Sequence, residues 1–595
     1  MKQNKYGTWA VGAFMLLLSA AACTDSYEST PVDMFTEDYL FSKTDSNGTV
    51  VRKYLNRIYY YMRNGHNGVN GDYLDAASDD ALSVISSESD VYKLAIGRYS
   101  ASNFINSDMI WSDPYLVIRR VNILLSGIDV VPFNTTYTDA LGNTRRLNDS
   151  MKAEARFLRA YFYFELVKRY GGVPIIGDKV YELNENIELP RSTFEQCIKY
   201  IVSELDDIKD DLRSLPLPDA AASAHVVNTQ AAQALKIRVL LYAASPAYQD
   251  KDVIQINGMG NFTVLNEATY QAGWERAALF ANEVLKDAGI NYTFTAMAAK
   301  DLADAGSDTP ADFIFRTYMG LVHGMESRHY PPFYLGNAQT IPSHNLAAAF
   351  PAKNGYPITD SRSLYDEQDP YLIARDNRFN MNLYYQGKKF GAYNSNIDVS
   401  EGGKDSESFH IYASRSGYYL SKFLSTTQKN MLDPFQTLNS RHFNPLLRKT
   451  EVWLNYAEAA NEAWGPESKG DDCKYSAYDV LKIIREKSGG ITDATYLSEV
   501  ASEGKAAFRK LIQNERRIEF AFEDHRFWDL RRCLLPLDTT IEGIQVTRTD
   551  NGLSYEIKEI EQRPLDALRY YYLPLPNDEL LKNPNLKNNM GWNNN

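Results

Sequence analysis

Residues 514–532 read NERRIEFAFEDHRFWDLRR, in which apolar and charged residues are interleaved with the period of a helix. The helical spacing begins upstream, in the series Phe508, Leu511, Glu515, Ile518 and Phe522. Arg516 and Glu519 have opposite charges three positions apart and are expected to pair, whereas Glu515 and Glu519 are like charges one turn apart. One of these two acids is therefore expected to pair with an arginine of a neighbouring element. Because adjacent arginines keep both acids ionised, the pattern favours a structural charge lattice over a catalytic pair of carboxylates.

Further segments show apolar residues three and four positions apart, which predicts helices. They are residues 111–125, 152–170, 194–212, 231–241, 274–284 and 453–464. Ser192 and Glu195 predict a capping box before the third helix, which Pro216 closes, and Gly171 and Gly465 stop the second and the last. Two helices joined by a short turn, with small Ala residues where they cross, are typical of tetratricopeptide-like pairs. No strict 34-residue repeat is present. We therefore predict a mainly α fold of degenerate tetratricopeptide-like helical pairs.

Two long segments interrupt this pattern, at about residues 64–110 and 291–445. Gly, Pro, Asn and Tyr divide the later one into short pieces, such as residues 313–315 and 418–420, with no sustained helical stripe. Loops carried on a rigid scaffold are where recognition usually takes place. We therefore expect these irregular inserts to carry the ligand face.

The N-terminus indicates export. Lys2 and Lys5 precede an apolar run over residues 9–18, followed by small residues and Cys23. The segment resembles a bacterial lipoprotein signal in which Cys23 becomes the lipidated N-terminus. It departs from that pattern at Ala20, where Leu is commoner. The alternative is a simple signal peptide in which the cysteine has no role. We expect a signal peptide over residues 1–22, a lipidated tether over 23–36 and one domain over 37–595. Within that domain we expect a helical-repeat part to about 289, the irregular insert over about 290–445 and a helical part from about 446.

The composition excludes several classes of protein. Of 595 residues, 44% are hydrophobic and 23% charged, which is typical of a folded chain with a large core. The net charge of −13 disfavours a nucleic-acid partner, and the four cysteines match no zinc spacing. The 41 Tyr, 26 Phe and 7 Trp suit stacking on sugars or peptides, but also ordinary packing.

In several sequence motifs, the chain resembles the SusD/RagB family of outer-membrane nutrient-binding lipoproteins. The resemblance rests on residues 514–532, on AEARFLRAYFYFELVKRYGGVPII at 153–176, on shorter matches within 345–351, 415–420 and 448–461, and on YLPLP at 572–576. It implies a lipid-anchored α fold at the cell surface that acts as a lid over a SusC-like TonB-dependent transporter. Such proteins capture oligosaccharides, or in some members peptides, without catalysis and without a cofactor.

A carbohydrate site needs flat aromatic rings for sugar faces and short polar groups for hydroxyls. The resemblance implies that the two inserts come together on one face to supply them. The candidates are Asp72, Tyr73, Tyr99, Arg316, Tyr318, Arg328, Tyr330, Tyr334 and Asn337. Among them we expect Tyr330 or Tyr334 to stack on a sugar ring. Residues 384–385 and 570–572 offer further tyrosines, the latter interpreted as strand packing.

Three alternatives stay open at this point. The Tyr-rich inserts favour a glycan over a peptide ligand. Asp75, Asp79 and Asp80 could ligate calcium, but they lack the usual spacing, so a solvated acidic loop is the default and no metal is predicted. No hydrolase, zinc or nucleotide motif is present; a glycosidase, needing only two carboxylates, and a pure interaction scaffold are the remaining rivals.

Overall fold

The computed structural model describes residues 37–592 except 63–65, 67, 85–87, 183–184, 216–224, 250–269, 287–293, 295, 298–309, 318–320, 323 and 428–439. The signal peptide, Cys23 and the tether lie outside the described residues. Within the described part, no helix is both long and apolar enough to cross a membrane. The buried apolar side chains form one connected cluster between Leu40 and Trp592.

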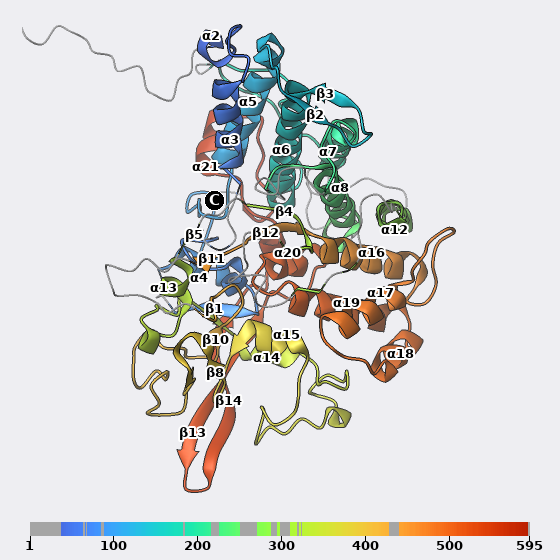
Figure 1. Cartoon of the computed structure of the whole chain (residues 1–595). Coiled ribbons are helices and arrows are strands. Elements are labelled where there is room, and N and C mark those ends of the chain that lie inside the picture. Colours follow the sequence, from blue (N-terminus) through green and yellow to red (C-terminus); the bar gives the residue numbers. More distant parts are fainter. Residues whose placement is uncertain are drawn as a thin grey trace, which may run out of the picture.

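An array of packed helices makes up the main body (Figure 1). Its members are α3 (Thr49–Tyr59), α5 (Ser112–Gly127), α6 (Leu147–Tyr170), α7 (Phe194–Ile208), α8 (Thr229–Ala244), α12 (Tyr270–Lys286), α16 (Lys449–Trp464), α17 (Ala477–Lys487), α18 (Thr495–Ser502), α19 (Lys505–Glu519) and α20 (His525–Arg532). Each packs on its neighbour along the chain: α5 on α6, α6 on α7, α7 on α8, α8 on α12, α12 on α16, and α16 on α17 and α19. The prediction of a mainly α fold built from helical pairs is confirmed.

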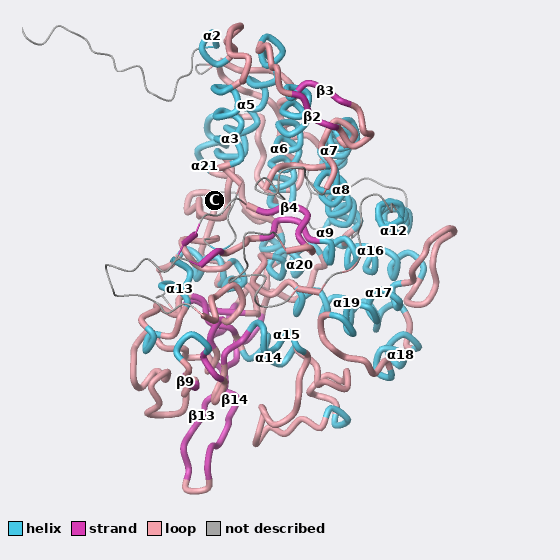
Figure 2. The backbone as a smooth tube through the Cα atoms, viewed as in Figure 1, coloured by secondary structure: helices cyan, strands magenta, loops and turns pink. Residues whose placement is uncertain are grey.

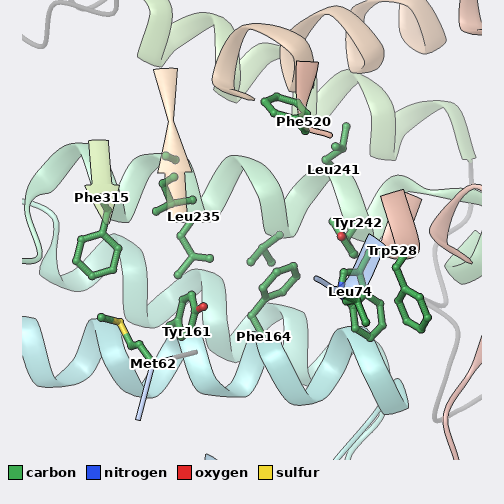
Figure 3. Close-up of a cluster of buried hydrophobic side chains, with 14 of the residues drawn as sticks. Met62, Leu74, Tyr161, Phe164, Leu235, Leu241, Tyr242, Phe315, Phe520 and Trp528 are labelled. Atoms are coloured by element: carbon green, nitrogen blue, oxygen red, sulfur yellow. The ribbon is translucent and has the colours of Figure 1, made fainter. Parts of the chain in front are cut away.

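Helix α6 lies at the centre of this array and is buried on nearly every side. Figure 3 shows Tyr161 and Phe164 of α6 in one cluster with Leu241 and Tyr242 of α8. The rings of Phe164 and Tyr242 meet edge to face at 5.1 Å, a favoured geometry for aromatic pairs. The helix ends where predicted, because Gly171 adopts φ +74°, a conformation that costs glycine little.

Predicted boundaries of two helices are wrong. The capping box of α7 is formed by Thr193 and Gln196, one position after the predicted pair, and the helix ends at Ile208, well before Pro216. The helix that carries the charged stretch ends at Glu519 and not at Phe522, whose φ of +62° is incompatible with helix. A second short helix, α20, then begins at His525.

The strands form two-stranded antiparallel pairs (Figure 2). These are β1 (Ala81–Ser83) with β6 (Thr340–Pro342), β2 (Thr136–Thr138) with β3 (Thr144–Arg146), β4 (Phe313–Arg316) with β12 (Pro445–Arg448), β5 (Leu321–Val322) with β11 (Ser440–Arg441), β7 (Leu383–Tyr384) with β10 (Tyr419–Leu420), β8 (Lys389–Phe390) with β9 (Ser395–Asn396), and β13 (Thr539–Thr549) with β14 (Gly552–Arg563). The hairpin β13–β14 projects from the body in Figure 1 and has no counterpart among the predicted elements. The segment around Tyr570 forms a 3-10 turn, η9 (Leu568–Tyr571), so its interpretation as a strand is wrong.

The late insert contains only short helical segments, as its sequence predicts. These are α13 (Gly324–His329), η6 (Pro332–Tyr334), α14 (His344–Ala349), η7 (Ser361–Ser363), α15 (Asn377–Asn382) and η8 (Gly391–Tyr393). Other short elements are α2 (Glu37–Leu40), η2 (Leu74–Ala77), α4 (Asp90–Ala95), η3 (Ile128–Val130), α9 (Pro246–Gln249) and α21 (Asn577–Lys582).

Candidate functional site

The early and late inserts meet, as expected. Strand β1 of the early insert pairs with β6 of the late one, with Ser83 opposite Thr340. The buried carboxylate of Asp72 holds the two together, because it accepts hydrogen bonds from Thr340 Oγ1 at 2.7 Å, Ser83 Oγ at 3.0 Å and Gln339 Nε2 at 3.3 Å. Burial raises the pKa of Asp72 to about 6, against the opposing effect of these three donors. Asp72 therefore joins the inserts from the inside.

The two predicted tyrosines of the early insert are also buried. The hydroxyl of Tyr73 lies 3.1 Å from His66 Nδ1, and its ring is stacked near Phe423. Tyr99 stacks on Trp592 with ring centroids 5.2 Å apart. Neither ring offers a free face, so in this structure both pack the interior instead of contacting solvent.

The same holds for the two tyrosines expected to stack on sugar. Tyr330 has no exposed surface, and its hydroxyl donates to the carbonyl of Ser425 at 2.7 Å. Tyr334 is buried and stacks on Phe390 at 4.5 Å, while Lys404 Nζ donates to its hydroxyl at 2.7 Å. The expectation that either ring forms a sugar platform does not fit this conformation, because ring faces packed against other rings are closed to a ligand.

The remaining candidates differ in accessibility. Arg316 is buried with its guanidinium 4.5 Å from the ring centroid of Phe443. Arg328 is half-buried and Asn337 is exposed beside the buried tyrosines. Tyr318 lies outside the described residues. Ligand contacts by Arg328, Asn337 and Tyr318 therefore stay predictions.

Among the exposed aromatic side chains of the late insert, which also include Tyr412, the rings of Phe333 and Phe409 contact each other, and we call this pair the aromatic ledge. Phe333 lies on η6, one position before Tyr334, and 46% of it is exposed; Phe409 lies on the loop before β10 and is 56% exposed. The two ring centroids are 6.0 Å apart at an interplanar angle of 60°. The ammonium of Lys404 lies 5.1 Å from the centroid of the Phe333 ring. Two exposed rings with an adjacent cation form a surface on which a flat ligand can stack.

Both residues of the ledge are held in place by the packing and hydrogen bonds of their neighbours. The ring of Phe333 contacts that of buried Tyr334 edge to face at 5.3 Å. The loop that carries Phe409 is held against the hairpin, since Glu401 N donates to Val546 O and Ile544 N donates to Ser416 O, each at 2.9 Å. The projecting hairpin thus positions one half of the ledge.

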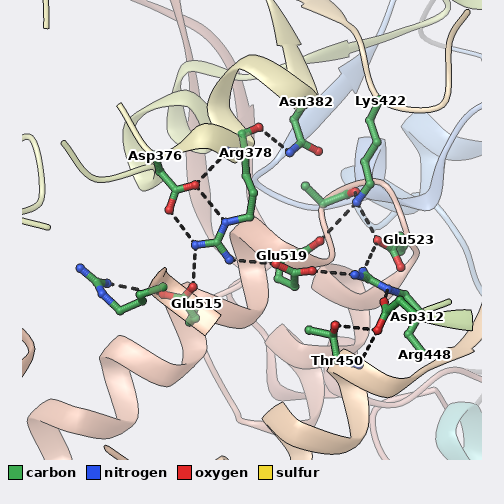
Figure 4. Close-up of polar contacts among 12 residues, drawn as sticks. Asp312, Asp376, Arg378, Asn382, Lys422, Arg448, Thr450, Glu515, Glu519 and Glu523 are labelled. Atoms are coloured by element: carbon green, nitrogen blue, oxygen red, sulfur yellow. Dashed lines mark hydrogen bonds and ion pairs between the residues drawn. The ribbon is translucent and has the colours of Figure 1, made fainter. Parts of the chain in front are cut away.

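The charged stretch at 514–532 forms a buried network (Figure 4). Arg378 donates to Glu515 at 2.6 Å and to Glu519 at 2.9 Å, and Arg448 donates to Glu519 at 2.6 Å. The prediction of an arginine from a neighbouring element is confirmed. The predicted pairing of Glu519 with Arg516 is wrong, because Arg516 turns to Asp529 on α20, at 3.0 Å. Acids neutralised in this way are structural.

The acidic cluster of the early insert is also part of this packing. Asp79 accepts two hydrogen bonds from Arg526, both at 2.7 Å, and Asp80 pairs with Arg517. Asp75 accepts from the backbone of Phe522 at 2.8 Å. The expected solvated acidic loop is therefore wrong, since these carboxylates dock the early insert on α19 and α20. Throughout the described part, no group of three or more His, Cys, Asp or Glu is arranged to hold a metal ion.

Comparisons with known proteins agree with this architecture. Residues 304–592 match the family model described as the SusD family, and residues 38–241 match a second model described as starch-binding, associating with outer membrane. The chain belongs to the SusD family. Proteins of this family are non-catalytic glycan-binding proteins, in agreement with the expectation that the chain is not an enzyme.

Individual relatives are distant but match over most of their length. SusD-like protein P2 of Formosa agariphila is 24% identical over 507 residues, which cover 83% of this chain and 84% of the relative. A SusD-like protein from Bacteroides fragilis has a similar solved structure, with a TM-score of 0.70, 23% identity and coverage of 92% of this chain and 98% of that one. A SusD-like carbohydrate binding protein from the same species gives a TM-score of 0.67, 21% identity and coverage of 91% and 99%. At these identities the solved structures establish the SusD fold.

The sequence selected tyrosines that are buried in this structure and passed over the exposed phenylalanines of the same insert. Phe333 lies inside the aromatic run at 328–337, beside the tyrosines that the prediction selected. Phe409 had a weaker signal, a short apolar run (Phe-His-Ile-Tyr, 409–412) within a stretch rich in Ser, Gly and Glu. A run of large apolar residues in a polar loop, without helical or strand period, was the feature that could have identified it.

Proposed function

We propose that the chain is a cell-surface lipoprotein that binds an oligosaccharide at the aromatic ledge and delivers it, as a lid, to a SusC-like TonB-dependent transporter. The observation that carries the proposal is the exposed pair Phe333 and Phe409 on the late insert of a SusD family chain. The starch-binding, outer-membrane description of the model at residues 38–241 supports both the ligand class and the location.

The chemistry of the ledge favours a glycan. The rings can cover the apolar face of a sugar, while the exposed amide of Asn337 and the half-buried guanidinium of Arg328 are donors within the same insert. Peptide capture relies more on backbone amides and exposed strand edges. An oligopeptide ligand of the RagB type is the alternative, and a surface glycosidase is the least favoured one.

The delivery step rests on the family and on the N-terminal signal. Acylation of Cys23 would hold the chain on the outer membrane next to its transporter, since acyl chains anchor a protein on a bilayer without spanning it. The chain has no nucleotide-binding motif. Closure of the lid would therefore be driven by contacts that differ between the open and closed states.

A binding screen tests the ligand class. A soluble chain beginning at Thr24 is applied to plant, microbial and host glycans and to peptide pools, and each bound glycan is then assayed for new reducing ends. We expect binding to one glycan class without cleavage. Binding to peptides alone would contradict the glycan proposal, and reducing ends that accumulate with time would contradict a non-catalytic role.

Delivery needs a separate measurement in cells. Deletion of the chain is expected to slow uptake of the labelled glycan while leaving its hydrolysis outside the cell unchanged. Unchanged uptake would contradict the lid proposal even if the glycan binds.

A further inference from the structure

A cavity of about 400 Å³ lies far from the ledge, in the helical part of the chain. It is open to solvent on one side and is lined by α5, by the connection between α6 and α7, and by α21. Figure 1 places α5 and α21 in the upper part of the molecule and β8 and β13 in the lower part. Cavities of roughly 300–1,000 Å³ are typical of small-ligand sites. None of the ledge residues lines this cavity.

The cavity has an apolar wall that is held in place. Trp111 is buried, with its ring 5.3 Å from that of Tyr115 and 5.2 Å from that of Tyr170. The hydroxyl of Tyr115 donates to Pro174 O at 3.0 Å, which fixes this ring as well. Aliphatic side chains complete the wall and the mouth: Leu116, Ile118, Ile176, Ile187 and Leu586. Because the rings of Trp111 and Tyr115 pack on each other and the ammonium of Lys179 lies over that of Tyr181, aliphatic side chains make up much of the accessible wall, which suits a compact apolar group.

The charges around the cavity do not cancel. Lys179 pairs with Glu185, and Lys582 pairs with Glu579 at 2.8 Å. The fifth charged lining residue, Arg119, uses its Nε to donate to Tyr181 O at 3.1 Å. Within the described ranges, no carboxylate lies at ion-pair distance from Arg119. Three cations and two anions therefore leave one positive charge at the cavity.

We propose that this cavity is a second binding site, which takes a small apolar carboxylate. Its aliphatic or aromatic part lies against Ile176 and Leu586, and its carboxylate binds the guanidinium of Arg119. A planar guanidinium can hold a carboxylate with two parallel hydrogen bonds, which gives such a site both affinity and a preference for charge. The proposal concerns a site and a ligand class separate from the glycan and the ledge.

Titration calorimetry with two probes of one shape tests it. The probes are 3-phenylpropionate and its neutral amide, each titrated into the chain beginning at Thr24. We expect the carboxylate to bind about tenfold more tightly, which corresponds to about 1.4 kcal/mol. Arg119→Gln is expected to abolish this preference. The matched control is Arg120→Gln, because Arg120 lies over the ring of Tyr61 outside the cavity and its loss should leave the preference intact.

A second variant tests the cavity itself. Leu116→Trp places a larger side chain at the mouth, where 37% of Leu116 is exposed, and is expected to weaken binding of both probes at least tenfold with unchanged circular dichroism. Glycan affinity at the ledge should stay the same in all three variants, so this proposal and the glycan proposal can fail separately. Absence of binding by both probes, or equal binding that Arg119→Gln and Leu116→Trp leave unaltered, would overturn the second site.

Discussion

Replacing Glu519 by glutamine removes a charge that two buried arginines share. Glu519 Oε1 accepts from Arg448 at 2.6 Å and Oε2 accepts from Arg378 at 2.9 Å. In Glu519→Gln one of these oxygens becomes an NH₂ group, which faces a guanidinium donor and can accept nothing. The variant therefore loses one charge-assisted hydrogen bond and weakens the other.

The expected loss of folding free energy in Glu519→Gln follows from the pKa of Glu519. Burial alone would raise the pKa of Glu519, but the charges of Arg448, Arg378 and Lys422 outweigh burial and lower it from 4.5 to about 2. Since each tenfold change in acid dissociation is worth about 1.4 kcal/mol, the charged form contributes about 3 kcal/mol to folding. Removal of one partner of a buried ion pair costs a similar roughly 3–5 kcal/mol.

The pH dependence has a definite sign. A carboxyl whose folded pKa is lowered stabilises the fold fully above its unfolded pKa, and this contribution disappears as the pH falls toward the folded pKa. The difference between wild type and Glu519→Gln is therefore expected to be constant between pH 6 and 8 and to shrink below about pH 4.5.

Urea unfolding followed by tryptophan fluorescence measures this difference. Glu556→Gln is the matched control, because Glu556 is exposed on β14 and its loss should change the unfolding free energy by less than about 0.5 kcal/mol. A loss below about 1 kcal/mol at pH 7, or a loss as large at pH 3 as at pH 7, would refute the reasoning.

Three further predictions concern the anchor, the interior and the acidic cluster. Cys23→Ala should leave the fold intact but move the chain from the detergent-extracted membrane fraction to the soluble one; a variant still held on the membrane would exclude lipidation at Cys23. Tyr330→Phe loses the hydrogen bond to Ser425 O and should destabilise the fold by about 1 kcal/mol in urea titrations, with glycan affinity unchanged; a loss of affinity would return Tyr330 to the binding site. Asp79→Asn breaks the bidentate pair with Arg526 and should cost roughly 3–5 kcal/mol, whereas EDTA should leave the wild-type midpoint unchanged; a shift on chelation would indicate a metal at this cluster.

The helical part of the fold could be predicted because its signals are local. Apolar spacing and stop residues placed α6 and α16, with Gly171 and Gly465 as their ends. The sequence could not decide which residue caps α7, because Ser192 and Thr193 are both good caps and only the backbone conformation decides between them. The hairpin β13–β14 was missed although it has a local signal, since Asn551-Gly552 is a typical hairpin turn and Leu553, Tyr555 and Ile557 alternate with polar residues after it.

The exposed rings of the proposed site were harder to predict, because exposure is a property of the tertiary structure. Tyr330, Tyr334 and Phe333 lie within five positions, yet only Phe333 faces solvent. The ring of Tyr334 stacks on that of Phe390, which lies 56 positions later in the sequence, and no local pattern predicts that contact. The charge lattice was recognised as structural, but its partners Arg378 and Arg448 come from distant segments and were not identified.

The central claim is that the ligand stacks on the aromatic ledge. It is tested most directly by the affinity of Phe333→Ala and Phe409→Ala for the glycan found in the screen, measured by calorimetry. Tyr60→Ala is the matched control, because Tyr60 is 87% exposed on another part of the chain, at the end of α3. We predict that each phenylalanine variant binds at least tenfold more weakly, a loss of about 1.4 kcal/mol, and that Tyr60→Ala binds as the wild type does. Full affinity in both phenylalanine variants would contradict the account.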